Sequence, residues 1–545
     1  MPIKFDFKIK KQHLKSTQFS FFIALFFVIF YNTAFFDALL NIIEITSARG
    51  ILFIVNVAIV LTLLTFIVIS IATLPYLAKP IISIVFIGGA AVAYFMGAYG
   101  IVIHRLMIQN AMETDANEVN GLFNYTLLLY IIFLGALPSL LIHRVNIIYK
   151  SFLLEFWNKF KFITIALIIS LLLIFSMSKD YASFFRNHKE VRQMANPLNF
   201  IYAGISYFTT NTQVVDVKPI ENDAAVNSFG KAQIKPTLFI LVIGETVRAD
   251  HWGINGYKRN TTPLLAKQQL INFTNFASCG TETAVSVPCM FSVLNREDYS
   301  DKKAKSQEGL LDVISHAGFS VLWRDNNSSC KGTCDRVVYE DLRNLKIPDV
   351  CNHRECFDEI LLHQLDEKVL PVTGSKIIVL HPKGSHGPDY FNRYPENMEH
   401  FTPTCKDNQL QHCSKKELIN AFDNTIRYAD YFLNKTINWL AEKNPEYNTA
   451  LLYLSDHGES LGEHGLYLHG MPYAIAPKEQ KRVPFFLWIS DDFKNANALD
   501  AECLNEYRTQ PYSHDNLFHT VLGMLNISTH VYNAELDIAQ PCRKR

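Results

Sequence analysis

The sequence predicts two parts of different kinds, an α-helical membrane domain over residues 1–179 and an α/β domain over residues 236–545, with a connector over residues 180–235. Three observations predict this division. The first part carries five long apolar stretches, the pattern of transmembrane helices. The last part alternates strand-like and helix-like segments, the pattern of a mostly parallel sheet with helices on both faces. All ten cysteines lie in that last part.

Most of the five apolar stretches are near the roughly 20 residues that a helix needs to cross a bilayer. They cover residues 19–40, 51–76, 81–104, 125–142 and 162–178. A signal peptide would give one short apolar run with a cleavage site, so that explanation fails. Buried core helices of a soluble protein are the other alternative, and five successive stretches almost free of charge argue against it.

Basic residues predict the orientation of these helices, because Lys and Arg concentrate on the cytoplasmic side. The leader and the second and fourth connections carry most of them: Lys4, Lys8, Lys10, Lys11, Lys15, Lys79, Arg144, Lys150, Lys159 and Lys161. The first and third connections have only Arg49 and Arg105. We therefore expect a cytoplasmic N-terminus, and an odd number of spans then places everything after about residue 179 on the far side.

Two further segments are candidates for contact with membrane lipids. The third connection, residues 106–123, is polar with helical spacing; it would lie on the outer membrane surface or form an ordinary solvated helix. The early connector is rich in aromatic residues at 181–185 and 197–202, which suits the membrane interface. Its later part is polar.

The ten cysteines indicate an oxidising compartment, because an even number confined to the exported part is typical of a disulfide framework. Neighbour spacing suggests four pairs and leaves a fifth by elimination: Cys279 with Cys289, Cys330 with Cys334, Cys351 with Cys356, Cys405 with Cys413, and Cys503 with Cys542. Spacing alone does not fix the connectivity. A zinc site at Cys330 and Cys334 is the competing interpretation, but the usual two-residue gap is missing.

Net charge argues against a nucleic-acid partner. Lys and Arg together number 51, as do Asp and Glu, so no global basic field would attract a polyanion. Glycine-rich phosphate loops and dinucleotide fingerprints are absent from the sequence as well.

The α/β domain offers metal-ligating side chains where predicted strands end. Strands are expected at 237–243, 319–323, 376–380, 449–454 and 483–489, and helices at 310–317, 358–370 and 416–442. Glu245 follows the first strand, His381 and His386 the third, and Asp456 with His457 the fourth. In parallel sheets the chemistry lies at the carboxyl ends of the strands, so these side chains should meet.

Carboxylate oxygen and imidazole nitrogen together suit Zn²⁺. Glu245, Asp456 and His457 are therefore the predicted ligands of one ion. A helix cap and a satisfied loop histidine would explain Asp456 and His457 if they stood alone. The second strand end and the downstream histidines His464 and His469 favour the metal site.

A nucleophile is expected in the hydroxyl-rich segment 278–288, where a helix should begin at about Thr281 or Glu282. A helix N-terminus stabilises a phosphate or an ionising hydroxyl, and Zn²⁺ would lower the pKa of a bound threonine. Composition leaves Thr281, Thr283 and Ser286 as equal candidates. Simple capping of the helix is the alternative for each of them.

Five motifs in these segments resemble the lipid A phosphoethanolamine transferases, the family that includes the mobile colistin-resistance enzymes. They are VIGETVRADH at 242–251, SCGTETAVSVPCMFS at 278–292, LWRDNNSSCKG at 322–332, KGSHGPDYFNRYP at 383–395 and SDHGESLGEHGLYLHGMPYAIAPKEQ at 455–480. The resemblance covers essentially the whole chain. It implies five membrane helices followed by a disulfide-stapled, alkaline-phosphatase/sulfatase-like periplasmic domain in the bacterial inner membrane.

The resemblance also assigns roles to individual residues. It implies a catalytic zinc held by Glu245, Thr283, Asp456 and His457, with Thr283 as the nucleophile. His386 and His469 would lie near the transferred phosphoryl group, where a second zinc is a further possibility. Asn327, Lys331 and Glu459 match positions that line the substrate pocket. Cys330 and Cys334 flank Lys331, and some relatives lack this pair, which puts the placement of Lys331 in doubt.

The implied activity is transfer of phosphoethanolamine from phosphatidylethanolamine to lipid A through a covalent threonine intermediate. The added amine would lower surface negative charge and give resistance to polymyxin and other cationic peptides. We expect a monomer. The sequence leaves the acceptor open between lipid A, a core heptose and a Kdo sugar.

Rival activities on the same fold are a phosphoglycerol transferase, a phosphatase and a sulfatase. Sulfatases carry a Cys-x-Pro-x-Arg nucleophile motif, which neither Cys279 nor Cys289 matches. The ten cysteines and the SCGTETA motif favour the phosphoethanolamine branch over a phosphoglycerol transferase. A non-catalytic membrane sensor is a rival of another class, and the intact set of Glu245, Thr283, Asp456 and His457 argues against it.

Overall fold

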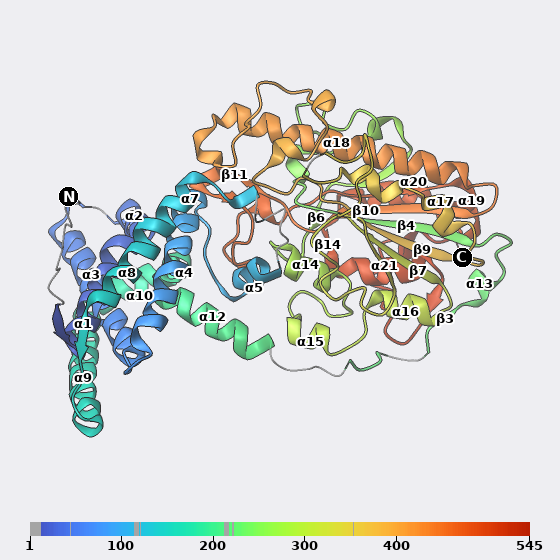
Figure 1. Ribbon diagram of the computed structural model, residues 1–545. Coiled ribbons are helices and arrows are strands. Elements are labelled where there is room, and N and C mark those ends of the chain that lie inside the picture. Colours follow the sequence, from blue (N-terminus) through green and yellow to red (C-terminus); the bar gives the residue numbers. More distant parts are fainter. Residues whose placement is uncertain are drawn as a thin grey trace, which may run out of the picture. The chain divides into compact units, whose positions relative to one another are not determined.

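The computed structural model describes residues 12–43, 45–113, 119, 121–211, 217–220, 223–352 and 354–544. It forms two compact units (Figure 1). The helical unit comprises residues 1–108 and 123–211, and the α/β unit comprises residues 109–122 and 212–545. Residues 180–211, expected as the start of a connector, therefore group with the helical unit. The leader lysines Lys4, Lys8, Lys10 and Lys11 lie outside the described residues.

The helical unit consists of apolar helices with short connections. Its elements are β1 (His13–Lys15), α1 (Ser16–Tyr31), α2 (Thr33–Ile42), α3 (Ala48–Ala72), α4 (Ala78–Tyr99), α7 (Tyr125–Tyr130), a π-helical turn (Ile131–Ala136), α8 (Leu137–Arg144), β2 (Asn146–Ile148), α9 (Phe152–Ser176), α10 (Ser178–Asn187), α11 (Lys189–Gln193) and α12 (Leu198–Asn211). Within the described residues, four helices are long and apolar enough to cross a membrane, or five if the bent pair α1 and α2 is one span.

The first apolar stretch is bent, where the sequence suggested one straight helix. Helices α1 and α2 meet at Asn32 with an angle of 61°. The Asn32 side chain donates to the Phe27 carbonyl at 3.0 Å and to the Asn196 carbonyl at 2.6 Å, and it accepts from the Asn196 backbone N–H at 2.9 Å. These side-chain bonds to backbone groups stabilise the bend, because they satisfy polar groups that a broken helix leaves open.

Two other helix boundaries differ from the expected stretches. Helix α4 ends at Tyr99, five residues before the expected end, and Gly100 follows in the left-handed region with a φ of 68°. Glycine adopts that conformation without a steric penalty, so it ends the helix. Helix α9 begins at Phe152, ten residues before the expected apolar stretch, because it continues through the polar residues Lys159 and Lys161.

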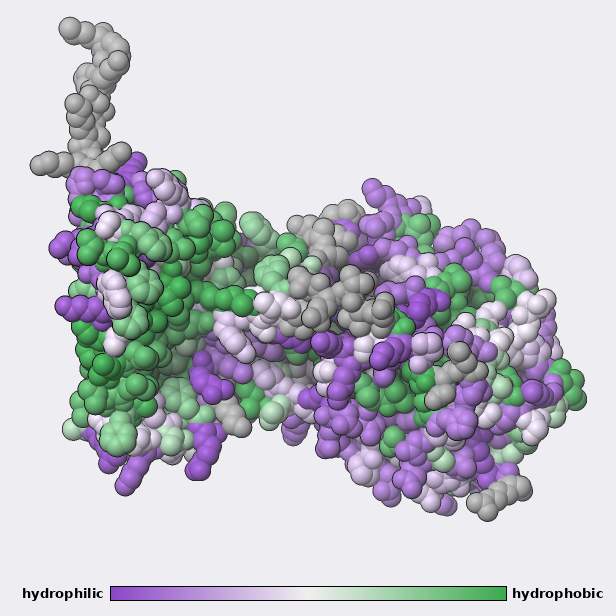
Figure 2. Space-filling model, turned by 90° about the horizontal axis from the view of Figure 1, so that it is seen from below, coloured by the Kyte–Doolittle hydropathy of each residue, from purple (hydrophilic) through white to green (hydrophobic). Residues whose placement is uncertain are grey.

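The surface of the helical unit is apolar over a broad belt with hydrophilic surface at both ends (Figure 2). Large apolar side chains from several helices are exposed there, among them Phe22, Ile29, Leu52, Leu153, Leu172 and Phe175. Contiguous exposed surface of this kind is typical of a protein that contacts lipid. The belt supports the membrane assignment independently of helix length.

The α/β unit is built on a seven-stranded sheet in the order β5-β13-β10-β4-β9-β7-β8. The strands are β4 (Thr237–Gly244), β5 (Leu270–Phe273), β7 (Ser320–Asp325), β8 (Val338–Asp341), β9 (Lys376–His381), β10 (Asn448–Ser455) and β13 (Phe485–Ile489). Strands β10, β4, β9, β7 and β8 are parallel, whereas β13 is antiparallel to both of its neighbours. The five expected strands are therefore present, and β5 and β8 are additional.

Helices cover both faces of this sheet (Figure 1), as the alternating sequence pattern predicted. The α-helices in the described part of residues 212–545 are α13 (Ser228–Lys231), α14 (Thr283–Met290), α15 (Asp301–Lys305), α16 (Leu310–His316), α17 (Leu365–Val369), α18 (Lys415–Glu442), α19 (Asp491–Ala496), α20 (Ala501–Glu506) and α21 (Leu517–Met524). The single helix expected over 358–370 is wrong. It is a 3₁₀ turn, Asp358–Leu362, followed by α17, and Gln364 between them has a φ of 52° that interrupts a continuous helix.

All ten cysteines are paired in disulfides, and the pairs are those that neighbour spacing suggested: Cys279–Cys289, Cys330–Cys334, Cys351–Cys356, Cys405–Cys413 and Cys503–Cys542. Four of the five close short loops, and Cys503–Cys542 joins α20 to the C-terminal segment. Cross-links of this kind stabilise the fold chiefly by restricting the unfolded chain.

Candidate functional site

Two central strands, β4 and β10, end side by side and carry the first acidic residues of the site. Their parallel register pairs Ser455 with Gly244, and the Asp456 backbone N–H donates to the Gly244 carbonyl at 2.9 Å. Glu245 and Asp456 are therefore the next residues on adjacent strands. Both strands are buried along their whole length, so they hold these two carboxylates on a rigid base.

Thr283 is the first residue of α14, with Glu282 at the N-cap. The turn before this helix needs glycine, because a Cβ at Gly280 would lie 2.9 Å from the Ser286 backbone nitrogen. The Ser286 hydroxyl donates to the Asp456 carbonyl at 2.5 Å, which ties α14 to the end of β10. The helix start thus presents Thr283 to the strand ends.

The Thr283 hydroxyl lies among the predicted metal ligands. Its Oγ1 is 3.1 Å from Glu245 Oε2, 3.3 Å from Glu245 Oε1 and 3.3 Å from His457 Nε2. His457 Nε2 is in turn 3.4 Å from Glu245 Oε1 and 3.4 Å from Asp456 Oδ2. Glu245, Asp456 and His457 are fully buried and Thr283 is 4% exposed. The structure therefore brings all four residues together.

These atoms fit a metal cation. One ligand atom each from Glu245, Asp456 and His457 lie within 4.8 Å of one another. His457 Nδ1 donates to the Gly458 carbonyl at 3.0 Å, which leaves the lone pair of Nε2 facing two carboxylates. Asp456 Oδ2 has no hydrogen-bond partner within the described part of the chain. Buried carboxylates that converge on an imidazole lone pair, with one carboxylate oxygen left without a donor, favour a positive charge among them to offset their repulsion.

The pKa values report the same crowding. Burial and the neighbouring Glu245 carboxylate raise the pKa of Asp456 to about 7. Burial alone would lower the pKa of the His457 imidazole, but Asp456 and Glu245 raise it above its ordinary value. A group whose ionisation depends this strongly on a buried neighbour is typical of a functional site.

His386, His469 and Glu459 lie beside this cluster. The ring centroids of His457 and His469 are 4.4 Å apart, and those of His386 and His469 are 5.2 Å apart. His469 Nδ1 is 3.3 Å from Glu459 Oε1. Burial and the nearby His457 lower the pKa of His469 to about 3, so its imidazole is neutral at pH 7. Burial raises the pKa of Glu459 well above its ordinary value.

Asn327 and Lys331 lie in different surroundings. The Asn327 amide nitrogen donates to Glu245 Oε2 at 2.7 Å, so this residue belongs to the wall of the four-residue cluster. The Lys331 ammonium is buried and lies 3.7 Å from Glu113 Oε2, on residues 109–122. Lys331 and Glu113 line a cavity of about 490 Å³, which Pro288 of α14 also borders, whereas Asn327 is not part of its lining.

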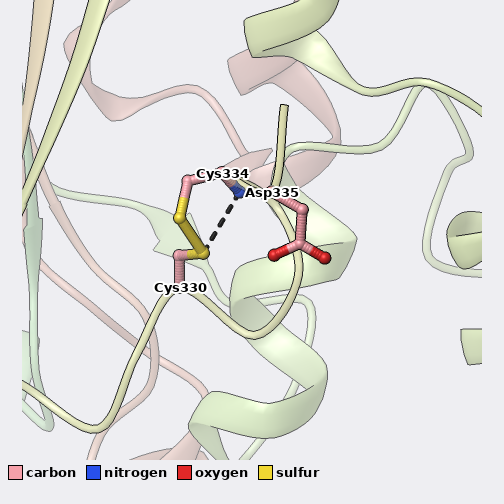
Figure 3. Close-up of side chains that lie close together, drawn as sticks. All are labelled: Cys330, Cys334 and Asp335. Atoms are coloured by element: carbon pink, nitrogen blue, oxygen red, sulfur yellow. Dashed lines mark hydrogen bonds between the residues drawn. A yellow bond between two sulfur atoms is a disulfide. The ribbon is translucent and has the colours of Figure 1, made fainter. Parts of the chain in front are cut away.

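The Cys330–Cys334 disulfide rules out a thiolate zinc site at that position. Figure 3 shows the two sulfurs bonded to each other, with the Cys334 backbone N–H donating to Cys330 Sγ at 3.2 Å. Asp335 is the third member of this group, and without thiolates it makes no cation site. The small ring instead encloses Lys331 and Gly332, whose φ values are 54° and 93°.

Two buried residues of the site escaped the sequence reasoning. Asp325 is the last residue of β7 and accepts from His381 Nδ1 at 3.0 Å. Its position at a strand end was the available signal. His514 accepts from the Cys279 backbone N–H at 3.0 Å and donates to the Ser455 carbonyl at 3.0 Å, so it joins the segment before α14 to β10. Only tertiary structure reveals His514, because it follows the two-residue strand β14 (Tyr512–Ser513).

Comparisons with known proteins agree with this geometry. The sulfatase family model matches residues 237–527, and the model described as phosphoethanolamine transferase EptA/EptB matches residues 61–212. Phosphoethanolamine transferase EptA of Escherichia coli K12 is 43% identical over 520 residues, 94% of each chain. Phosphatidylethanolamine transferase Mcr-1 of Escherichia coli is 40% identical, over 86% of this chain and 88% of its own.

A solved structure extends the similarity to the whole chain. The integral membrane lipooligosaccharide phosphoethanolamine transferase A of Neisseria meningitidis superposes with a TM-score of 0.94 at 37% identity. The match covers 98% of this chain and 100% of that one. It includes the helical unit as well as the α/β unit. The chain therefore belongs to the phosphoethanolamine transferase family of EptA and Mcr, with a helical membrane region and an alkaline-phosphatase/sulfatase-like domain.

Proposed function

We propose that this chain transfers phosphoethanolamine from phosphatidylethanolamine to lipid A, with Thr283 as a covalent nucleophile. The observation that carries the proposal is the position of the Thr283 hydroxyl, 3.1 Å from Glu245 and 3.3 Å from His457, at the start of a helix. A nucleophilic hydroxyl needs a group that stabilises its ionised form, and a helix N-terminus contributes to that. The names of the EptA and Mcr relatives support the transferred group.

Glu245, Asp456, His457 and the Thr283 hydroxyl would hold one Zn²⁺, since two carboxylates, an imidazole and a hydroxyl are a borderline-to-hard donor set. Bound there, the ion supplies the positive charge that stabilises the ionised hydroxyl and the phosphoryl oxygens. A second ion at His386 and His469 is part of the proposal for turnover. The centroids of the His386 and His469 rings are 5.2 Å apart, a separation at which both imidazoles could bind the same ion.

The first half-reaction would form a bond between Thr283 Oγ1 and the phosphorus of the donor lipid. The bond from phosphorus to the glycerol oxygen breaks, and diacylglycerol leaves after that oxygen gains a proton, which balances the proton that Thr283 Oγ1 loses. In the second half-reaction a phosphate oxygen of lipid A attacks the same phosphorus. The bond to Thr283 then breaks, and Oγ1 regains a proton from the attacking phosphate group, so the hydroxyl is restored.

His386 and His469 would interact with the oxygens of the attacking and leaving groups. His469 lies next to His457, and His386 lies next to His469. A protonated His386 within reach of the leaving oxygen would donate the proton that diacylglycerol requires, whereas His469, neutral at pH 7, would hydrogen-bond the transferred phosphoryl group. Glu459 orients His469 through the contact at Nδ1. Lys331, with its ammonium in the cavity beside α14, would bind phosphate charge on a substrate.

The membrane helices would hold the site at the lipid surface, where both substrates are. We propose the bacterial inner membrane, with the N-terminus in the cytoplasm, the α/β unit in the periplasm and a monomeric enzyme. The basic residues of the leader support this orientation, and five disulfides support an oxidising compartment. The product carries an added amine, so cells should bind polymyxin less strongly.

The test is mass spectrometry of lipid A from cells that express the wild type, Thr283→Ala or no enzyme. Added phosphoethanolamine on lipid A in the wild type alone is the expected result. Modification of a core heptose or a Kdo sugar instead would overturn the proposed acceptor. Equal modification by Thr283→Ala would overturn the nucleophile.

A further inference from the structure

The Asp325 carboxylate accepts from three buried donors and offers none. Its Oδ2 accepts from Trp323 Nε1 at 2.8 Å and from His381 Nδ1 at 3.0 Å, and its Oδ1 accepts from the Asn327 backbone N–H at 2.8 Å. All four residues are between 0% and 2% exposed. The bond from Nδ1 assigns the proton of His381 to that nitrogen, so Nε2 carries a lone pair.

That lone pair is one of three acceptors around the Asn327 amide nitrogen, which has two hydrogens to share among them. The amide nitrogen lies 3.2 Å from His381 Nε2, 3.1 Å from the Pro382 carbonyl and 2.7 Å from Glu245 Oε2. All three are acceptors. The amide oxygen accepts from the Ser328 backbone N–H at 2.7 Å. A flipped amide would set oxygen against three acceptors, so only one orientation is compatible with these partners.

The chain of contacts ends at the proposed nucleophile. Glu245 Oε2, which receives the Asn327 amide, is the same oxygen that lies 3.1 Å from Thr283 Oγ1. These side chains lie at the ends of three adjacent parallel strands: Asp325 and Asn327 at β7, His381 at β9 and Glu245 at β4. Hydrogen bonds outside a ligand set of this kind fix the direction in which the ligands point.

We propose that Asp325 and His381 are positioning residues that act through Asn327 on Glu245. The inference rests on the proposed metal site and adds to it. The Asn327 side chain orients Glu245, one of the proposed ligands, and its amide makes this hydrogen bond before substrate binds. Asp325 holds the His381 tautomer, His381 holds the Asn327 amide, and the amide holds Glu245.

Asp325→Asn tests this with almost no change in shape. The new amide must place its NH₂ group against Trp323 and His381 or against the Asn327 backbone N–H, so at least one donor loses its acceptor. The second variant is His381→Gln. The imidazole donates to Asp325 from one side of its ring and accepts from Asn327 on the other side. A glutamine amide that donates to residue 325 cannot place its oxygen at the position of Nε2, so Asn327 loses that acceptor. Asp430→Asn is the matched control, because Asp430 is a buried carboxylate that accepts the Leu264 and Leu265 backbone N–H groups elsewhere.

The measurement is Zn²⁺ affinity of the full-length, metal-stripped protein in detergent, by competition with a chromophoric chelator. Asp325→Asn and His381→Gln should each weaken binding by about 10- to 100-fold, the range for loss of groups that orient a metal ligand. The double variant should lose little more Zn²⁺ affinity than the single variant that binds Zn²⁺ more weakly, because both substitutions act through the Asn327 amide. Asp430→Asn should lower thermal stability and keep the Zn²⁺ affinity of the wild type.

Transfer kinetics give a second reading. A positioning role predicts a lower kcat with the KM for phosphatidylethanolamine within about twofold of the wild type. Unchanged Zn²⁺ affinity in folded Asp325→Asn and His381→Gln, or fully additive losses in the double variant, would overturn the proposal. Zn²⁺ affinity is measured without transfer, so this outcome is distinguishable from failure of the proposed activity, which Thr283→Ala tests.

Discussion

Thr281 and Thr283 form a matched pair for testing the nucleophile. Both are 4% exposed, and each hydroxyl makes its own contacts inside the α/β unit. Thr283→Ala removes the oxygen that faces Glu245 and His457, and we expect transfer to fall on the order of 10³-fold or more, since the covalent step is lost. Folding should change little, because no backbone group loses a partner.

Thr281→Ala should give the opposite result. Its Oγ1 donates to the Met471 carbonyl at 2.6 Å, and alanine leaves that buried carbonyl without its donor. The free energy of unfolding should fall by about 1–3 kcal/mol. Each kcal/mol corresponds to roughly 2–4 °C in Tm for a domain of 150–250 residues, so a fall of several degrees is expected. Transfer should fall less than about tenfold, because the hydroxyl points away from the ligands.

The assay incubates each full-length protein with phosphatidylethanolamine and no acceptor. Peptide mass spectrometry should place one phosphoethanolamine on Thr283 in the wild type and in Thr281→Ala, and none in Thr283→Ala. Calorimetry supplies the Tm of each protein. A modified Thr281 or Ser286, or full turnover by Thr283→Ala, would refute the reasoning.

Three further predictions concern the disulfide ring, the metal and pH. Replacing both Cys330 and Cys334 with Ser should raise the KM for the donor, because the ring holds Lys331 in a left-handed conformation; an unchanged KM would contradict this. Chelation should abolish transfer while the disulfide-held unit stays folded by circular dichroism, and Zn²⁺ should restore activity; unfolding on chelation would make the metal structural. Burial lowers the pKa of His519 to about 4, below its ordinary value of 6.5, so the unfolded chain binds the proton more tightly. Stability should therefore fall as the pH drops from about 6.5 toward 4, and a His519→Asn variant with the same slope in calorimetry would contradict this assignment.

The sheet and the meeting of Glu245, Asp456 and His457 at its edge were predictable because two local signals coincide. Buried strands such as β4 and β10 appear as continuous apolar runs, and a parallel sheet gathers whatever follows them at one edge. Glu245, Asp456 and His457 follow those runs directly. The choice of Thr283 over Thr281 was different in kind. It rested on family resemblance, since helix periodicity alone does not tell which hydroxyl faces a neighbouring strand.

The remaining features depend on contacts between distant segments. The bend at Asn32 is stabilised by Asn196, 164 residues away, and no local signal in an apolar stretch reports such a partner. His514 reaches the site because β14 pairs with β6 (Phe276–Ala277), and two-residue strands have no periodicity to detect. Propensity and pattern are local quantities, so they predict elements better than the packing that joins them.

Residues 109–122 have a practical consequence for the biochemistry of this enzyme. They belong to the α/β unit, although they precede most of it by more than a hundred positions, and they bring Glu113 to within 3.7 Å of the Lys331 ammonium. A soluble fragment that starts near residue 235 would lack the Glu113 carboxylate. The Lys331 ammonium would then lose its counter-charge and could pair with other groups. Inhibitor screens and kinetic constants obtained on such a fragment would then describe an altered Lys331. An internal peptide covering 109–122, added back or fused, is the natural means to restore the native electrostatics of that cavity.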